Sequence, residues 1–148
     1  MTPFTRALCA ALLCFAALSA RGVDFPVMEF SAGIHRIEAE VASTPQARQL
    51  GLMHRTAMPA YHGMLFVFPR PAGECMWMRN TLLPLSVAFI DGDGKIINIE
   101  DMQPQTENNH CAARPARYAL EMNLNWFKSR GLTAGSTIMG IERASTAQ

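Results

Sequence analysis

Charge of either sign, cysteine and long apolar runs are all scarce in this sequence, and each scarcity excludes a class of protein. Charged residues make up 17% of the 148 positions, and 13 Lys and Arg stand against 12 Asp and Glu. This near-balance gives no electrostatic basis for binding nucleic acid. The longest apolar run, residues 7–18, is shorter than the roughly 20 residues that a helix needs to cross a bilayer. Intrinsic disorder is excluded as well, because 49% of the residues are hydrophobic.

Several enzyme and metal motifs are also missing. The sequence has no Cys-x-x-Cys pair, Gly-x-Ser-x-Gly elbow, His-Glu-x-x-His helix, Walker loop or dinucleotide fingerprint. Asp91-x-Asp93-Gly94 matches only the start of a calcium loop, since Lys95 and Met102 occupy the fifth and twelfth positions. A hairpin turn explains these residues better. We therefore predict no metal site and no cofactor, and the missing motifs argue against an enzyme without deciding the question.

The N-terminal apolar run is typical of a secretory signal peptide. Arg6 supplies a positive charge before residues 7–18, and small residues precede a cleavage site after Ser19. We expect cleavage there or one residue later, so residues 1–19 are removed. The remaining chain, residues 20–148, is expected to be a single domain in the periplasm or outside the cell, with no stable membrane span.

Cleavage would remove two of the four cysteines and leave Cys75 and Cys111. Exported proteins meet an oxidising environment, so this pair is predicted to form a structural disulfide. A closed loop of this size corresponds to roughly 4 kcal/mol of stabilisation in the chain-entropy estimate. The alternative is a reactive or metal-binding thiol pair, which the missing Cys-x-x-Cys spacing disfavours.

Hydrophobic patterning predicts many short strands and few helices. Strands are expected at residues 34–42, 64–68, 75–79, 85–90, 95–102, 118–122 and 137–141. Residues 54–63 and 103–116 are expected to be loops, because they are polar and contain proline or glycine. Residues 118–122 alternate, which places Tyr118, Leu120 and Met122 on one face and Ala119, Glu121 and Asn123 on the other.

Two short helices are expected between these strands. The first begins with Thr44 as cap and Pro45 at the first helical position, and it ends at Gly51. The second covers residues 126–130, after Asn125. Helices that do not alternate regularly with strands exclude βαβ repeats. The predicted fold is mainly β (α+β): a compact, largely antiparallel β-barrel or sandwich-like domain with two short helices.

Four sequence blocks resemble a known family. They are residues 48–55 (RQLGLMHR), 63–68 (GMLFVF), 77–85 (WMRNTLLPL) and 118–123 (YALEMN), the last followed by Trp126 and Phe127. In this order they resemble the domain of unknown function 192 family, also called uncharacterised protein family 0127, over about residues 37–141. The resemblance implies a small mainly-β domain, usually exported or membrane-tethered in bacteria and archaea, and it implies no established activity. The family often has Asp after the Pro-Leu pair, where this chain has Ser86.

Polar residues inside these blocks are candidates for a ligand site. The candidates are Arg48, Arg55, Arg79, Asn80, Thr81, Glu121 and Asn123. Arginine offers a planar fork of donors for a carboxylate or phosphate, and Asn and Thr add short polar contacts. One interpretation is a cleft that holds a small polar ligand. The other is an internal Arg79–Glu121 ion pair, with Asn80 and Thr81 satisfying backbone groups of a turn.

Three hypotheses for the function follow. The leading one is an exported binding or accessory module for an unidentified small ligand, with no protein partner indicated. The second is an enzyme that acts on a small polar or saccharide-like substrate through Arg79 and Glu121. The third is a periplasmic copper-handling protein, because the ten methionines carry thioethers that suit Cu(I). Methionine also fills irregular core gaps, and the four histidines are scattered.

Overall fold

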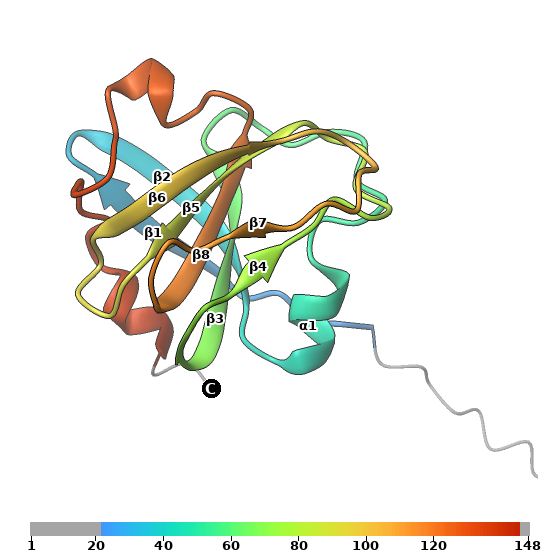
Figure 1. The fold of residues 1–148 in the computed structure, drawn as a ribbon, viewed down its shortest axis with the longest axis horizontal. Coiled ribbons are helices and arrows are strands. Elements are labelled where there is room, and N and C mark those ends of the chain that lie inside the picture. The colour runs from blue at the N-terminus through green and yellow to red at the C-terminus, as the bar shows by residue number, and fades with distance from the viewer. Residues whose placement is uncertain (1–21, 146–148) are drawn as a thin grey trace, which may run out of the picture.

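The computed structural model describes residues 22–145 (Figure 1), so the predicted signal peptide lies outside the described residues. The strands are β1 (Val27–Ala32), β2 (His35–Ala42), β3 (His62–Ala72), β4 (Cys75–Met76), β5 (Leu85–Ile90), β6 (Ile96–Met102), β7 (His110–Cys111) and β8 (Ala116–Asn123). The helices are α1 (Pro45–Leu50) and two 3₁₀ helices, η1 (Lys128–Arg130) and η2 (Ile141–Ser145). The mainly-β prediction is confirmed.

Six strands form one sheet in the order β1-β2-β3-β8-β5-β6, and β4 and β7 form a separate two-stranded ribbon. Every pair is antiparallel except β2 and β3, which are parallel and are joined across α1. A parallel pair needs a long crossover, and α1 and its flanking loops provide it. The sheet is open, with β1 and β6 as its edges, so the closed barrel is wrong.

The predicted last strand is replaced by two isolated bridges. Ser31 pairs with Met139, and Lys95 pairs with Thr137. The segment runs across the gap between the two edges at one end of the sheet, so it cannot extend along either edge as a strand. The Met139 amide donates to the Ser31 carbonyl at 2.7 Å, and the Ile138 amide donates to the Gly94 carbonyl at 2.8 Å.

Helix α1 begins and ends where the sequence predicts. The Thr44 side chain accepts a hydrogen bond from the Ala47 amide at 3.1 Å, Pro45 stands at the first helical position, and Gly51 has a φ of 49°. The second predicted helix is wrong in type and length. It is the 3₁₀ helix η1, closed by bonds such as Arg130 amide to Phe127 carbonyl, and Gly131 ends it with a φ of 66°.

Several strand boundaries differ from the prediction. β1 and β7 were not predicted, and β7 lies inside the expected loop 103–116 because Cys111 pairs there with Cys75. β3 continues through Pro69 and Pro71, since its register with β8 shifts between Val67 and Ala72 and no regular ladder is needed there. β4 is shorter than residues 75–79. The turn after β5 is confirmed, because the Asp91 carboxylate accepts bonds from the amides of Asp93 and Lys95.

Both faces of the sheet are buried, each against a different cover. The sealed face carries Leu65, Val67, Ile90, Tyr118, Leu120 and Met122, packed with Trp126, Phe127, Ile138 and Ile141. The pocket face carries Met64, Phe66, Phe68, Val87, Phe89 and Ala119, packed with Ala47, Leu52 and Met78. The alternation predicted for residues 118–122 is confirmed, since β8 gives Leu120 to the sealed face and Ala119 to the pocket face.

Candidate functional site

A cavity of about 500 Å³ lies on the pocket face of the sheet. Residues of α1 and the turn after it form one wall, and β4 with Trp77 forms the other; Figure 1 shows α1 beside the β4–β7 ribbon. β3 contributes Phe66 and Phe68, and β8 contributes Glu121. We call this cavity the Glu121 pocket.

Glu121 lies near the C-terminal end of β8, which is paired on both sides, with β3 and β5. It stands directly opposite Met64 on β3 and Val87 on β5, both of which are fully buried. The side chain lines the pocket although Glu121 is only 4% exposed. Within residues 22–145 the carboxyl group has neither an ion pair nor a hydrogen-bond partner. Burial among these apolar neighbours raises the pKa of Glu121 to about 8, so the carboxyl is mostly protonated at neutral pH.

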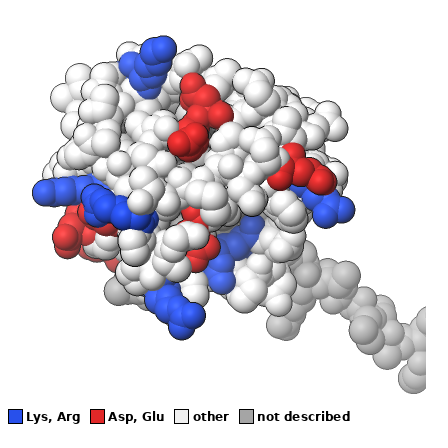
Figure 2. All heavy atoms as spheres, viewed as in Figure 1, with Lys and Arg blue, Asp and Glu red and all other residues white. Residues whose placement is uncertain are grey.

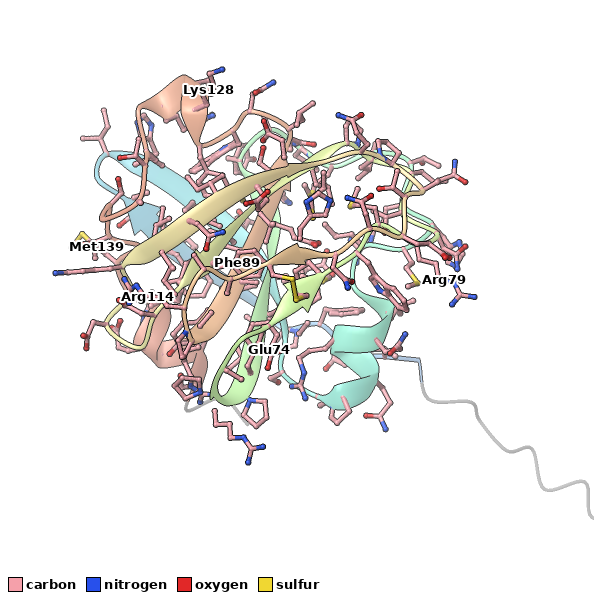
Figure 3. All side chains as sticks on the ribbon, in the orientation of Figure 1. Glu74, Arg79, Phe89, Arg114, Lys128 and Met139 are labelled. Atoms are coloured by element: carbon pink, nitrogen blue, oxygen red, sulfur yellow. A yellow bond between two sulfur atoms is a disulfide. The ribbon has the colours of Figure 1, made fainter. Side chains whose placement is uncertain are left out.

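The covalent link between β4 and β7 completes one wall of the pocket. Cys75 and Cys111 form a disulfide, as predicted, and Cys75 lines the cavity. Figure 3 shows this bond within the ribbon, in front of the sheet. The two strands have two residues each, so their backbone pairing alone is short. The disulfide therefore holds Met76 and the following Trp77 in place beside the cavity.

Arg48 lines the Glu121 pocket but is already engaged. One of its terminal nitrogens donates to the main-chain carbonyls of Ser43, at 2.5 Å, and Val67, at 3.0 Å. These bonds tie the start of α1 to β3. Thr81 is also in the pocket wall, and its hydroxyl donates to the Arg79 carbonyl at 3.3 Å.

Arg55 and Asn123 do not line the pocket. Arg55 forms two bonds to the Glu40 carboxylate, at 2.5 and 2.7 Å, and this pairing raises the pKa of Arg55 above its usual value. The Asn123 amide donates to the carbonyls of Met58 and Pro59, both at 3.1 Å. Asn123 therefore holds the loop before β3 in position.

Arg79 and Asn80 line a neighbouring hollow of about 600 Å³, which shares Pro45, Gln49 and Leu50 of α1 with the Glu121 pocket. The Arg79 guanidinium lies 3.6 Å from Glu107 and 5.8 Å from the centre of the Trp77 ring, and Figure 3 shows it at the outer edge of the molecule. The predicted Arg79–Glu121 ion pair is therefore wrong, because Arg79 turns outward where it stays solvated. Asn80 has a φ of 54°, and its carbonyl accepts from the His54 amide.

The structure thus brings three of the seven predicted residues, Arg48, Thr81 and Glu121, into one pocket. Arg79 and Asn80 are adjacent to it, because the two hollows share residues of α1. The prediction missed the apolar walls, Phe66, Phe68, Met76 and Trp77. All but Met76 lie inside the family-like sequence blocks, and that position was the available signal.

The methionines of the described residues lie in different surroundings, and Met139 is 58% exposed. Met64, Met78, Met102 and Met122 are fully buried core residues, whereas Met53 and Met76 line the pocket. Across residues 22–145 there is no group of three or more His, Cys, Asp or Glu side chains placed to hold a metal ion. In the same part of the chain, no helix has the length and apolar character that crossing a membrane requires.

The fold and the pocket define a small mainly-β domain with a ligand-sized cavity between its sheet and its covering elements. The family model DUF192, described as an uncharacterised ACR, matches residues 27–140. The chain belongs to this family, and the resemblance found in the sequence blocks is confirmed.

Two solved structures are similar to this chain. A protein from Sinorhizobium meliloti 1021, described as a candidate transcription regulator, is 34% identical with a TM-score of 0.77, over 82% of this chain and 99% of its own. A protein of unknown function from Novosphingobium aromaticivorans DSM 12444 is 30% identical with a TM-score of 0.73, over 76% and 84% of the two chains. No curated protein matches the sequence.

Proposed function

We propose that this protein is an exported binding domain whose small ligand occupies the Glu121 pocket. The observation that carries the proposal is a buried carboxyl group that reaches an apolar cavity and has no partner among residues 22–145. The signal-like N-terminus and the Cys75–Cys111 disulfide support export, because disulfides persist in oxidising compartments.

An unpartnered carboxyl in this position costs the folded protein free energy. Among the described residues the fully buried side-chain atoms without a partner are Arg117 Nη1 and Trp126 Nε1, so the Glu121 carboxyl stays open to the cavity, and its cost is the desolvation that raises its pKa. Leucine at position 121 would fit the surrounding Met64, Val87 and Phe66 without that cost. A ligand that bonds the carboxyl would offset the cost only while it is bound, which is the property of a binding site.

The size and walls of the pocket fit a small molecule with an apolar body and a polar end. Ligand pockets usually have volumes of about 300–1,000 Å³, with mainly apolar walls and a few polar groups. Here Phe66, Phe68 and Met76 provide the apolar walls and Glu121 the polar group. Trp77 lines the pocket and is 41% exposed, so it can contact both ligand and solvent.

An enzyme is the second candidate, favoured by the same carboxyl group. A glutamic acid with a pKa of about 8 can donate or accept a proton near neutral pH, as a general acid or base must. The lining provides no activated nucleophile beside it, because the Thr81 hydroxyl is bonded to the Arg79 carbonyl. Arg79 pairs with Glu107 and lines the neighbouring hollow. An enzyme that uses both Arg79 and Glu121 would therefore need a substrate that reaches from one hollow into the other.

The description of one relative raises DNA binding as a different class of function. DNA-binding surfaces concentrate Lys and Arg, because phosphate contacts dominate affinity. Figure 2 shows acidic and basic groups interspersed on the visible face, and the whole sequence has a formal net charge of only +1. These observations favour a small ligand over a nucleic acid.

A fragment screen by NMR tests the proposal on protein recovered after export of the full sequence. We expect fragments with an apolar ring and one polar group to shift the Trp77 indole and the Glu121 amide signals. Glu121→Gln should change the set of binders, whereas Glu107→Gln, which alters an exposed carboxylate, should leave it unchanged. Binders that perturb only residues outside the pocket, or no binders, would overturn the proposal.

A further inference from the structure

The charges around the Glu121 pocket are unequal. Three residues that carry ionisable side chains line it: Glu121 from β8, Glu74 from the turn between β3 and β4, and Arg48 from α1. Two residues with carboxyl groups and one with a guanidinium thus line the same cavity. The inequality disfavours a ligand that brings further negative charge.

Arg48 does not compensate for the buried carboxyl. Its Nη1 donates to the Ser43 and Val67 carbonyls, and no bond or ion pair joins it to Glu121. Those contacts fix the guanidinium against the main chain at the junction of α1 and β3. The described part of the chain therefore brings a potential anion into the pocket without a matching cation.

The walls suit a cation for a separate reason. Aromatic rings carry negative potential on their faces, and they attract ammonium groups held within about 6 Å. Phe66, Phe68 and Trp77 all line the cavity, and Trp77 already has the Arg79 guanidinium 5.8 Å from its ring centre. The pocket thus combines a buried carboxyl with aromatic walls.

We propose that the ligand of the Glu121 pocket carries an ammonium group, which pairs with the Glu121 carboxylate while the ligand's apolar body packs against Trp77 and Phe66. The inference rests on the proposed binding function and names its ligand class. The charged hydrogen bond formed in this way is about twice as strong as a neutral one. It also supplies the partner that Glu121 otherwise lacks.

Binding of an ammonium group should release the proton of Glu121. Burial holds the pKa of this group at about 8, so the carboxyl is mostly neutral at pH 6 and about half ionised at pH 8. Glu74 and Arg48 are the other ionisable residues in the lining. Affinity for a cation should therefore rise with pH.

Three probes that share a phenyl ring test the charge. They are benzylamine as the cation, benzyl alcohol as the neutral compound and benzoate as the anion, each titrated calorimetrically at pH 6 and pH 8. We expect benzylamine to bind most tightly and to gain about tenfold or more in affinity at pH 8. Benzyl alcohol should bind more weakly without that gain, and benzoate should not bind.

Three variants locate the effect. Glu121→Gln keeps the size of the side chain and removes its charge, so the preference for the amine and its pH dependence should both disappear. Glu107→Gln removes an exposed carboxylate outside the lining, so it is the control and should keep both, whereas Glu74→Gln tests the second carboxyl of the lining and should keep the pH dependence. If Glu74→Gln instead removes the pH dependence, Glu74 is the partner and the inference is overturned.

The remaining outcomes separate this inference from the proposal beneath it. If benzyl alcohol or benzoate binds as tightly as benzylamine, the ammonium class is wrong and the binding pocket stands. The ammonium class is also wrong if none of the three binds while other fragments still occupy the pocket. If no probe and no fragment binds there, both proposals are wrong.

Discussion

The two faces of the sheet share their strands and differ in their covers. The sealed face is covered by large apolar side chains, Trp126, Phe127, Ile138 and Ile141, from the C-terminal part of the chain. The pocket face is covered by a six-residue helix and a ribbon with two residues in each strand. The first cover contributes fully buried side chains to the core, and the second leaves a cavity of about 500 Å³ that reaches Glu121.

Strand β8 contributes residues to both faces of the sheet. Tyr118, Leu120 and Met122 enter the sealed face, while Ala119 and Glu121 point to the other. A buried carboxyl is tolerated only on the side where the packing is incomplete. The comparison indicates that one face provides the stability of the domain and the other holds its binding site.

Truncation on the sealed face should have the largest effect on stability. Phe127 is fully buried in that core, so Phe127→Ala should lower the free energy of unfolding by about 3–5 kcal/mol. Trp77→Ala on the pocket side should cost less than about 1 kcal/mol, because Trp77 is 41% exposed. Urea denaturation followed by circular dichroism measures both. Equal losses would contradict the division of roles between the faces.

Loss of the disulfide should have the next largest effect. The double substitution Cys75→Ser and Cys111→Ser removes a link between residues 36 positions apart and should cost about 2–4 kcal/mol. Because Cys75 lines the pocket, fragment binding should weaken as well. The melting temperature and a repeat of the fragment titration check the two effects. A reducing agent added to the wild-type protein should reproduce them, and unchanged binding would show that the ribbon is not a functional wall.

The pH dependence of stability should distinguish the buried carboxyl from exposed ones. The pKa of Glu121 rises from 4.5 to about 8 on folding. Its contribution to the free energy of unfolding is therefore fully present below about pH 4.5 and is lost as the pH rises to 8. Relative to wild type, Glu121→Gln should therefore gain roughly 2–3 kcal/mol in unfolding free energy between pH 5 and pH 8.

Urea unfolding at the two pH values measures this difference. Glu107→Gln serves as control, since the Glu107 side chain is 68% exposed, and its pH profile should follow that of the wild type. Parallel profiles for Glu121→Gln and wild type would show that the carboxyl is not buried without a partner.

The cap of α1 should give the smallest effect. Thr44→Ala removes the hydrogen bond to the Ala47 amide and should cost about 1 kcal/mol. Because α1 forms one wall of the pocket, ligand affinity should fall more than stability does. Thr56→Ala, at an exposed position, is the control and should change stability by less than about 0.5 kcal/mol. If Thr44→Ala lowers ligand affinity no more than Thr56→Ala does, the cap does not position the pocket wall.

Local patterns predicted the elements whose determinants are local. The Thr44-Pro45 start of α1, the Asp91–Gly94 turn and the alternation of β8 depend on neighbouring residues, and all three are confirmed. The parallel pairing of β2 with β3 depends on strands separated by α1, and β7 depends on the distant Cys75. Both features depend on contacts between distant parts of the chain, which the hydrophobic pattern of the sequence does not predict.

The site was predicted in the same partial way. Glu121 was identifiable as a charged residue in an apolar, alternating strand, and it proved to be buried. The partners of Arg55 and Arg79 were not identifiable, because Glu40 and Glu107 approach them only through the fold. The apolar walls of the pocket resemble ordinary core residues in sequence, so patterning assigns them to the core.

The bridges made by the C-terminal segment have a consequence for association between copies of the chain. An open sheet exposes unpaired amides and carbonyls along its outer strands, which can template pairing with another molecule and lead to aggregation. Here the C-terminal segment forms main-chain hydrogen bonds with both outer strands. Met139 bonds to Ser31 in β1, while Gly135 and Ser136 bond to Ile96 in β6. A chain ending before Gly135 would free these positions in both outer strands at once. The segment that completes the sealed core thus also occupies edge positions that another chain could otherwise pair with.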